Sequence, residues 1–230
     1  MTIPGILRTA QTLTYYERLQ ELTANNLANV SSEGFKADRM TARLEAGSAV
    51  PTPVTQMDLS QGTFRETGRP LDLALDGQGY FVVRTARGER LTRGGGFRLD
   101  GSGTLTDQHG DPVLGQRGPV VIAGGVVEVR GDGTVVVDGQ AVDTLRLETV
   151  ANPATLRKEG GGQLSAAGPT MAADGATLRV RQGAIEESNQ DAIHGMVDLV
   201  TIQRAYTANI NVLRAMDGVL GSVANDLARP

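Results

Sequence analysis

The sequence contains no cysteine and no tryptophan, and it has only four tyrosines and four phenylalanines among its 230 residues. Without cysteine the chain cannot form a disulfide framework, a thiolate nucleophile or a cysteine-ligated metal site. Because aromatic residues make up only 3% of the chain, valine, leucine and isoleucine have to fill the core of any folded domain.

The sequence also lacks an excess of basic residues and any long apolar run. Its 22 lysines and arginines, set against 26 aspartates and glutamates, leave a net charge of −4, whereas a nucleic-acid binder needs a basic face. No apolar run approaches the roughly 18 residues that span a membrane. The first ten residues lack the apolar core of a signal peptide. We therefore expect no nucleic-acid partner, no membrane insertion and no cleaved signal peptide.

Glycine and proline are almost missing from the two ends of the chain. Of the 30 glycines, 25 lie between Gly47 and Gly183, and seven of the nine prolines lie between Pro51 and Pro169. Both residues disfavour helix interiors and favour turns, so this distribution predicts an α+β fold. We expect the N- and C-terminal helices to pair as a coiled-coil module and the central all-β domain to form a sandwich or partial barrel.

The same distribution suggests domain boundaries. We expect residues 1–36 and 185–230 to form a discontinuous helical inner domain, residues 37–60 an extended linker, and residues 61–184 a β-rich outer domain.

The C-terminal end carries a heptad pattern. One set of residues is spaced by seven, namely Leu199, Tyr206, Leu213, Leu220 and Leu227, and a second set follows it by three residues, namely Ile202, Asn209, Met216 and Val223. A pattern sustained over about four heptads favours a coiled coil over the alternative, a long core helix of one globular domain. We expect a helix from about Asp191 to Ala228, roughly 55 Å long, with Ser188 or Asn189 as its cap.

The N-terminal end predicts a second helix from about Ile6 to Val30, although its apolar residues are less regular. The helix is expected to end near Asn29 or Gly34, since either can take a left-handed or capping conformation. Asn25, Asn26 and Asn29 are dense for a helix and need hydrogen bonds if they are buried. The two helical ends, which we call the arms, can pair with each other.

The middle of the chain shows short strand patterns but no catalytic motif. Residues 126–130 and 134–137 flank a glycine-rich turn and predict a hairpin. Neither His109 nor His194 lies at a metal-ligand spacing from another ligand residue. There is no nucleophile elbow and no phosphate-binding loop, and aspartates such as Asp132 sit in turns, where this residue is common. We therefore predict no catalytic residue, no cofactor, no metal and no enzyme activity.

Several ordered segments resemble the bacterial flagellar rod and hook proteins. Residues 22–36, with the sequence LTANNLANVSSEGFK, resemble the N-terminal signature of that family. Residues 61–68 and 71–83 resemble its first β-domain block, and residues 91–100 its second. Residues 187–189, 196–200 and 203–206 resemble its C-terminal helix entry. Together the blocks cover most of the chain, and four blocks in order are more specific than any one.

The resemblance implies a structural subunit of the flagellar basal-body rod that assembles into a helical axial drive shaft. It implies as partners other copies of the chain, neighbouring rod proteins and the flagellar type III export apparatus. It also implies a location in the rod that spans the periplasm. The segment between Lys36 and Asp58 is short, which favours the proximal-rod member of the family, with the distal rod protein as the alternative.

We expect the subunit interface to lie on both arms. The expected residues are Leu13, Leu22, Asn25, Asn26, Leu27, Asn29, Leu199, Ile202, Tyr206, Asn209, Leu213, Met216 and Leu220. Two other classes of protein remain open on the sequence alone. One is a secreted β-rich adhesin or binding module, and the other is a small-molecule enzyme that uses carboxylates among Asp72, Asp76 and Asp100.

Overall fold

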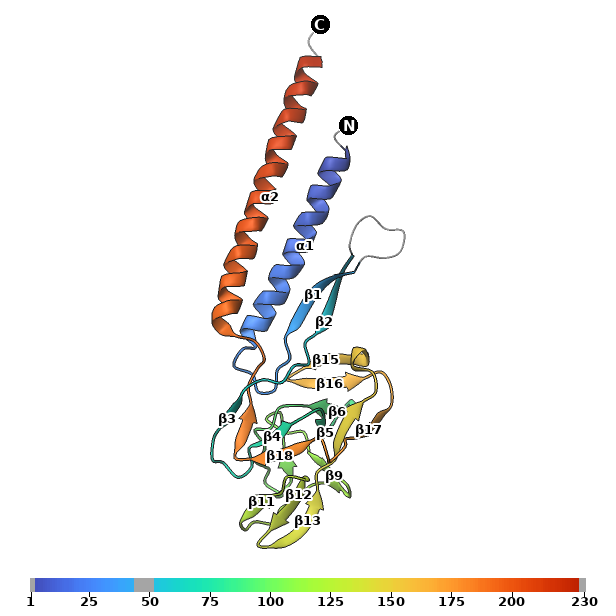
Figure 1. Ribbon diagram of the computed structural model, residues 1–230, viewed down its shortest axis with the longest axis vertical. Coiled ribbons are helices and arrows are strands. Elements are labelled where there is room, and N and C mark those ends of the chain that lie inside the picture. The colour runs from blue at the N-terminus through green and yellow to red at the C-terminus, as the bar shows by residue number, and fades with distance from the viewer. Residues whose placement is uncertain (1–2, 44–51, 228–230) are drawn as a thin grey trace. The chain divides into compact units, whose positions relative to one another are not determined.

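A computed structural model describes the backbone of residues 3–43 and 52–227 and the side chains of residues 8–41 and 52–222. Helix α1 (Ile3–Ala28) lies at one end of the chain and helix α2 (Ala192–Leu227) at the other, with strands between them (Figure 1). The predicted α+β class is confirmed. The side chains of Ile6, Val223 and Leu227, and residues Pro51 and Ala228, lie outside the described residues.

The chain divides into two compact units. The helical unit contains α1, residues 38–43 and 52–56, and the chain from Asp191 onward. The β unit contains residues 29–37 and 57–190. The segment predicted as an extended linker therefore contributes to both units.

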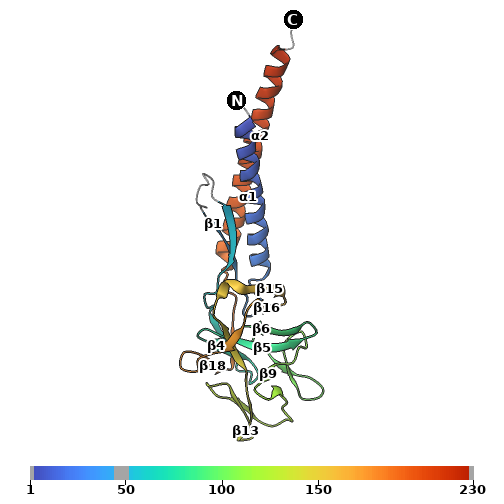
Figure 2. The same ribbon diagram turned by 90° about the vertical axis from the view of Figure 1, so that its right-hand side faces the viewer.

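The helical unit is built on an antiparallel helix pair. In Figure 1 and Figure 2 the two helices lie side by side, with the N-terminal end of α1 and the C-terminal end of α2 pointing the same way. The hydroxyl of Tyr206 on α2 donates to a carboxylate oxygen of Glu17 on α1 at 2.9 Å. Strands β1 (Asp38–Arg43) and β2 (Thr52–Met57) pair as a two-stranded sheet.

The largest sheet of the β unit has six antiparallel strands in the order β15-β16-β6-β5-β14-β17. Their bounds are β5 (Tyr80–Thr85), β6 (Gly88–Thr92), β14 (Leu147–Val150), β15 (Leu156–Gly160), β16 (Gln163–Ala166) and β17 (Thr170–Ala172). A short 3-10 helix, η1 (Pro153–Thr155), precedes β15. Among the described strands the pairing closes no barrel.

Shorter strands complete the β unit. Four pairs are β3 (Phe64–Glu66) with β19 (Ala184–Glu186), β4 (Leu73–Asp76) with β18 (Arg179–Gln182), β7 (Arg98–Leu99) with β8 (Leu105–Thr106), and β9 (Leu114–Gly115) with β10 (Gly118–Pro119). A three-stranded sheet contains β11 (Val127–Val129), β12 (Thr134–Val137) and β13 (Gln140–Thr144). The pairing of β11 with β12 is the hairpin that the sequence predicted, and its turn is held by Asp132, whose carboxylate accepts from the amide of Thr134 at 2.9 Å.

Strand β5 is buried on both faces and supplies both hydrophobic clusters of the β unit. Phe81 and Val83 point into the larger cluster, while Tyr80 and Val82 point into the smaller one. This division follows from the two-residue period of a strand. The larger cluster includes Leu73, Leu75, Phe97, Leu105 and Val113, and the smaller one includes Leu91, Leu114, Leu156 and Leu164.

Candidate functional site

The residues of the predicted heptad pattern differ in burial along α2. Ile202 is buried, and Leu199, Tyr206, Asn209, Leu213 and Leu220 are half-buried, but Met216 is exposed. Because Tyr206 bonds Glu17 across the pair, this side of α2 faces α1. The hydrogen bond to Glu17 raises the pKa of Tyr206 above its ordinary value. Asn209 donates its amide to the carbonyl of Ala205 in its own helix at 2.8 Å.

The three asparagines near the end of α1 have different surroundings. Asn26 is buried and bonds both backbone groups of Asp38, since its amide donates to the carbonyl at 2.8 Å and its oxygen accepts from the N–H at 3.0 Å. It therefore fixes the start of β1 on α1. Asn25 is exposed, and half-buried Asn29 accepts from the hydroxyl of Ser32 at 3.3 Å.

The leucines predicted on α1, namely Leu13, Leu22 and Leu27, are all half-buried. Of the residues predicted at the subunit interface, Asn25 and Met216 are exposed and the others are at least partly covered.

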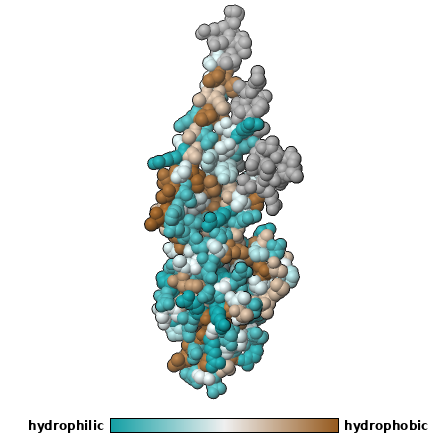
Figure 3. Space-filling model, in the orientation of Figure 1, coloured by the Kyte–Doolittle hydropathy of each residue, from teal (hydrophilic) through white to brown (hydrophobic). Residues whose placement is uncertain are grey.

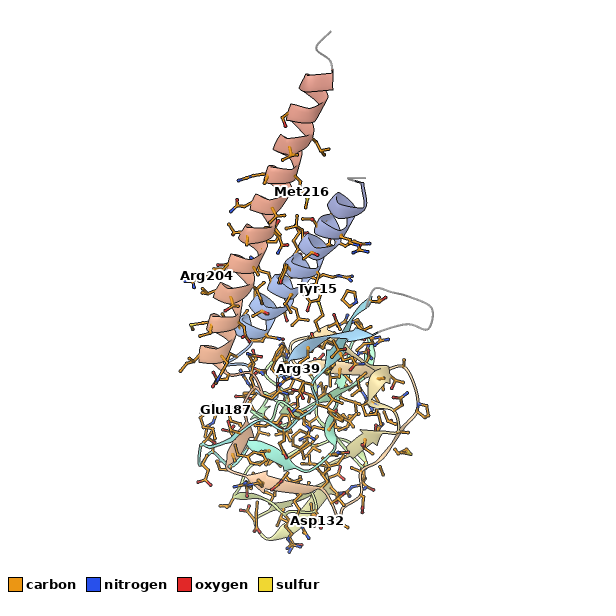
Figure 4. The ribbon with its side chains drawn as sticks, turned by 45° about the horizontal axis from the view of Figure 1, so that its top comes forward. Tyr15, Arg39, Asp132, Glu187, Arg204 and Met216 are labelled. Carbon is orange, nitrogen blue, oxygen red and sulfur yellow. The ribbon has the colours of Figure 1, made fainter. Side chains whose placement is uncertain are left out.

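A second apolar face on α2 was missed by the sequence reasoning. Ile193, Met196, Val197 and Val200 are 73%, 55%, 60% and 47% exposed. Their spacing of i, i+3, i+4 and i+7 places them on one side of the helix. We call these four residues the outer face. Figure 3 shows hydrophobic side chains gathered over the first turns of α2, and Figure 4 shows Arg204, just beyond the outer face, on the side of α2 turned away from α1. The spacing is present in the sequence, but the longer heptad pattern favoured the opposite side of α2 as the contact surface.

Helix α2 begins at a cap that differs from the prediction. The carboxylate of Asp191 accepts from the backbone N–H of His194 at 2.8 Å, which makes Asp191 the N-cap in place of Ser188 or Asn189. Ser188 instead accepts from the N–H of Gln190 at 3.2 Å. Asp191 also lies 3.0 Å from Nδ1 of His194.

Acid is expected to weaken this cap. The pKa of Asp191 lies below its ordinary value, first because the backbone N–H of His194 donates to the carboxylate and then because of the His194 side chain. Since the folded pKa is lowered, the contribution of the cap is complete above the unfolded pKa of about 3.9 and is lost as pH falls through the lower folded pKa. Cα chemical shifts of residues 192–195, followed between pH 6 and pH 2, should report fraying only in that acid window.

An Asp191→Asn variant is the control for the cap, because asparagine caps equally well but does not titrate. Its shifts at residues 192–195 should stay flat over the same acid range. Equal acid fraying in both proteins would mean that Asp191 does not control the start of α2.

The three aspartates considered for catalysis have separate structural surroundings. Asp72 is buried and pairs with Arg69 at 2.8 Å. Asp76 is exposed at the end of β4. Asp100 holds a turn, since its carboxylate accepts from the amides of Ser102 at 2.8 Å and Thr104 at 2.9 Å. The described residues contain no group of three or more histidine, aspartate or glutamate side chains placed to hold a metal ion. Within the same residues, neither helix has a stretch long and apolar enough to cross a membrane.

Known proteins resemble this chain over most of its length. Residues 181–227 match the family described as "Flagellar basal body rod FlgEFG protein C-terminal", and residues 74–140 match the "Flagellar hook protein FlgE/F/G D1 domain". The first match takes in all of α2, including the outer face, and the second begins in β4 and ends in β13.

Individual relatives align with this chain over about nine-tenths of its length and of their own. The flagellar basal-body rod protein FlgF of Escherichia coli (strain K12) is 34% identical over 232 residues, which cover 90% of this chain and 91% of that protein. FlgF of Rhizobium meliloti (strain 1021) is 32% identical and covers 92% of both chains. The flagellar basal-body rod protein FlgG of Bacillus subtilis (strain 168) is 30% identical over 89% of this chain and 92% of that protein. The chain therefore belongs to the flagellar basal-body rod protein family.

Proposed function

We propose that this protein is a structural subunit of the flagellar basal-body rod and that it self-assembles through its two terminal helices. Membership of the rod protein family supports the structural role. In this role the chain has no substrate and acts by packing against other copies of itself and neighbouring rod proteins. A contact of this kind that does not close on itself builds a filament and not a ring.

The observation that carries the proposal is the outer face of α2. Ile193, Met196, Val197 and Val200 are exposed although they are apolar, and the opposite side of the helix already packs against α1. A contiguous exposed apolar face on a protein typically marks a contact with another macromolecule. A neighbouring subunit that covers this face removes its apolar surface from water, at about 25 cal/mol for each Å² buried.

The predicted interface residues take two roles in this proposal. Leu199, Ile202, Tyr206 and Leu213 join α2 to α1 as an antiparallel coiled coil, and the more exposed Met216 and Asn25 contact neighbouring subunits. The other members of the predicted set, Leu13, Leu22, Asn26, Leu27, Asn29, Asn209 and Leu220, support the pairing. Residues 1–36 and 185–230 then form the inner domain, and residues 61–184 form an outer domain of packed β layers.

The proximal position in the rod is favoured over the distal one. The chain has only a short segment between Lys36 and Asp58, in which β1 and β2 pair as a two-stranded sheet. Relatives named FlgF and relatives named FlgG both match over most of the chain. The proposal further includes export without a cleaved signal peptide through the flagellar type III apparatus, and no enzyme activity.

A double substitution on the outer face tests the proposal. Met196→Glu with Val200→Glu places two charges where a neighbour is expected to bury apolar side chains, and burying unpaired charges is costly. We expect cells with this variant to become as non-motile as a deletion strain, with no rods in isolated basal bodies. The purified variant should keep the helix content and the thermal unfolding temperature of the parent protein.

The matched control is Gln203→Glu with Thr207→Glu, which adds the same two charges at the same spacing on exposed residues of α2. This variant should remain motile. Normal motility of the Met196/Val200 variant, with normal export, would show that the outer face is not an assembly contact.

A further inference from the structure

Three charged side chains meet in the interior of the β unit. Two of them come from the segments that follow α1 and precede α2 in the sequence. The amine of Lys36 lies 2.5 Å from one carboxylate oxygen of Glu186, and a guanidinium nitrogen of Arg93 lies 3.0 Å from the other. The side chain of Lys36 is 3% exposed, that of Glu186 0% and that of Arg93 6%. We call Lys36, Arg93 and Glu186 the root cluster.

The hydrogen bonds of the root cluster reach several parts of the β unit. Lys36 donates to the carbonyl of Ser60 at 2.8 Å, and Arg93 donates to the carbonyls of Leu75 at 3.0 Å and Gly77 at 2.5 Å. The carboxylate of Glu186 also accepts from the amide of Gly62 at 3.0 Å. Burial lowers the pKa of Lys36, and the neighbouring Glu186 opposes that shift.

Charge balance makes Glu186 the critical member of the cluster. One carboxylate serves two cations, so the cluster carries one excess positive charge. Removing Lys36 leaves the neutral pair Arg93–Glu186, and removing Arg93 leaves the neutral pair Lys36–Glu186. Removing the charge of Glu186 takes away the carboxylate that both buried cations contact, although Asp58 still favours the charge on Lys36. Breaking a buried ion pair by removing one partner is the costly case.

Backbone and side-chain hydrogen bonds join the segment that follows α1 to the segment that precedes α2. The amide of Gly34 donates to the carbonyl of Glu186 at 2.8 Å, and the amide of Ala37 donates to the side-chain oxygen of Asn189 at 2.7 Å. The side-chain amide of Asn189 in turn donates to the carbonyl of Asp58 at 2.8 Å. We call residues 33–37 and 186–189 the helix roots.

Close backbone contact at Gly34 strengthens this junction. Gly34 has a left-handed φ of +62°, and a Cβ at this position would overlap the backbone of Arg93. Only glycine combines that conformation with that contact. The first helix root is therefore pressed against the same residue whose side chain enters the root cluster.

We propose that the root cluster holds both helix roots together on the β unit in the free subunit, whether or not the helices beyond them are ordered. All of its contacts lie within the β unit, so they need no contribution from α1 or α2. A subunit built in this way reaches its neighbours with both roots already fixed, so that assembly has to order at most the helices. This lowers the conformational entropy lost on assembly. The root cluster acts in this way whichever surfaces the helices use in assembly.

Native-state hydrogen exchange on the full-length monomer tests this proposal. The reporter amides are Gly34, Ala37 and Gly62, with Val82 and Val83 in β5 as the reference. In the parent protein all five should be strongly protected. In Glu186→Gln we expect protection of the three reporters to fall by about a hundredfold or more, because two buried cations lose their partner, while the two β5 amides stay protected.

Two further variants make the charge argument specific. Lys36→Met leaves a neutral pair and should change the reporter protection by less than about tenfold. Glu148→Gln removes a buried carboxylate that pairs with Arg146 elsewhere in the β unit, and it should leave the reporters unchanged. If Glu186→Gln does not fold, Lys36→Met combined with Glu186→Gln keeps the excess charge at one and should still release the reporters.

Two results would overturn the proposal. One is reporter protection in Glu186→Gln, or in the double variant, that stays within about threefold of the parent. The other is an equal loss in Lys36→Met and Glu186→Gln, since the cluster would then act through its contacts and not through its charge balance.

Discussion

A Phe81→Ala variant is expected to lose about 3–5 kcal/mol of the free energy of unfolding of the β unit. Phe81 is fully buried in β5, and its ring meets that of Phe97 edge to face at 5.0 Å. Truncation to alanine leaves a cavity in the larger cluster, where Phe97 is the other buried aromatic residue. The loss is a large fraction of the 5–15 kcal/mol that typically stabilises a domain.

Urea unfolding followed by the amide signals of β5 measures this loss. Phe64→Ala serves as the control, because Phe64 is half-buried and stacks on the guanidinium of Arg181 at 4.7 Å. A contact of this kind at a partly exposed site contributes about 1 kcal/mol or less. If Phe81→Ala cost no more than Phe64→Ala, the larger cluster would have to relax around the missing ring.

A Leu213→Asp variant is expected to abolish rod assembly and motility while leaving the β unit folded. Leu213 is half-buried on the side of α2 that faces α1, and an unpaired carboxylate there opposes the burial of the helix pair. The β5 amides should keep their protection, because Leu213 belongs to the other compact unit. Motility, basal-body purification and hydrogen exchange together check the three parts of this expectation.

Asn211→Asp is the matched control for Leu213→Asp, since it adds the same charge two residues away at an exposed position. It should assemble normally. Unaltered motility of Leu213→Asp with normal export would contradict the role of the heptad pattern. Hydrogen exchange of the parent monomer shows whether the helices become ordered only on assembly. Strong protection of residues 6–30 and 195–227 at low concentration would mean that they are ordered beforehand.

The helices and the hairpin could be predicted because their signals are local. The long intervals without glycine or proline at both ends predicted α1 and α2, and the glycine turn around Asp132 predicted the pairing of β11 with β12. The start of α2 was less predictable, since Ser188, Asn189 and Asp191 are all good caps by residue type. Only the hydrogen bond to the amide of His194 distinguishes Asp191.

The root cluster could not be predicted, because its members are far apart in the sequence. Lys36 and Glu186 are separated by 150 residues, and each has the appearance of an ordinary surface charge within its own segment. The glycine run Gly94–Gly96 fits no dinucleotide-binding fingerprint, which needs a further glycine and a following helix. The structure gives its glycines a packing role, since a Cβ on Gly95 would overlap the carbonyl of Leu73.

Strand β5 also has a mechanical consequence. The strand lies between the two hydrophobic clusters, with Phe81 and Val83 packed in one and Tyr80 and Val82 packed in the other. A shearing force on either layer is therefore transmitted through the same strand to the other. We therefore expect the β unit to unfold under shear as one body and not as two separate layers.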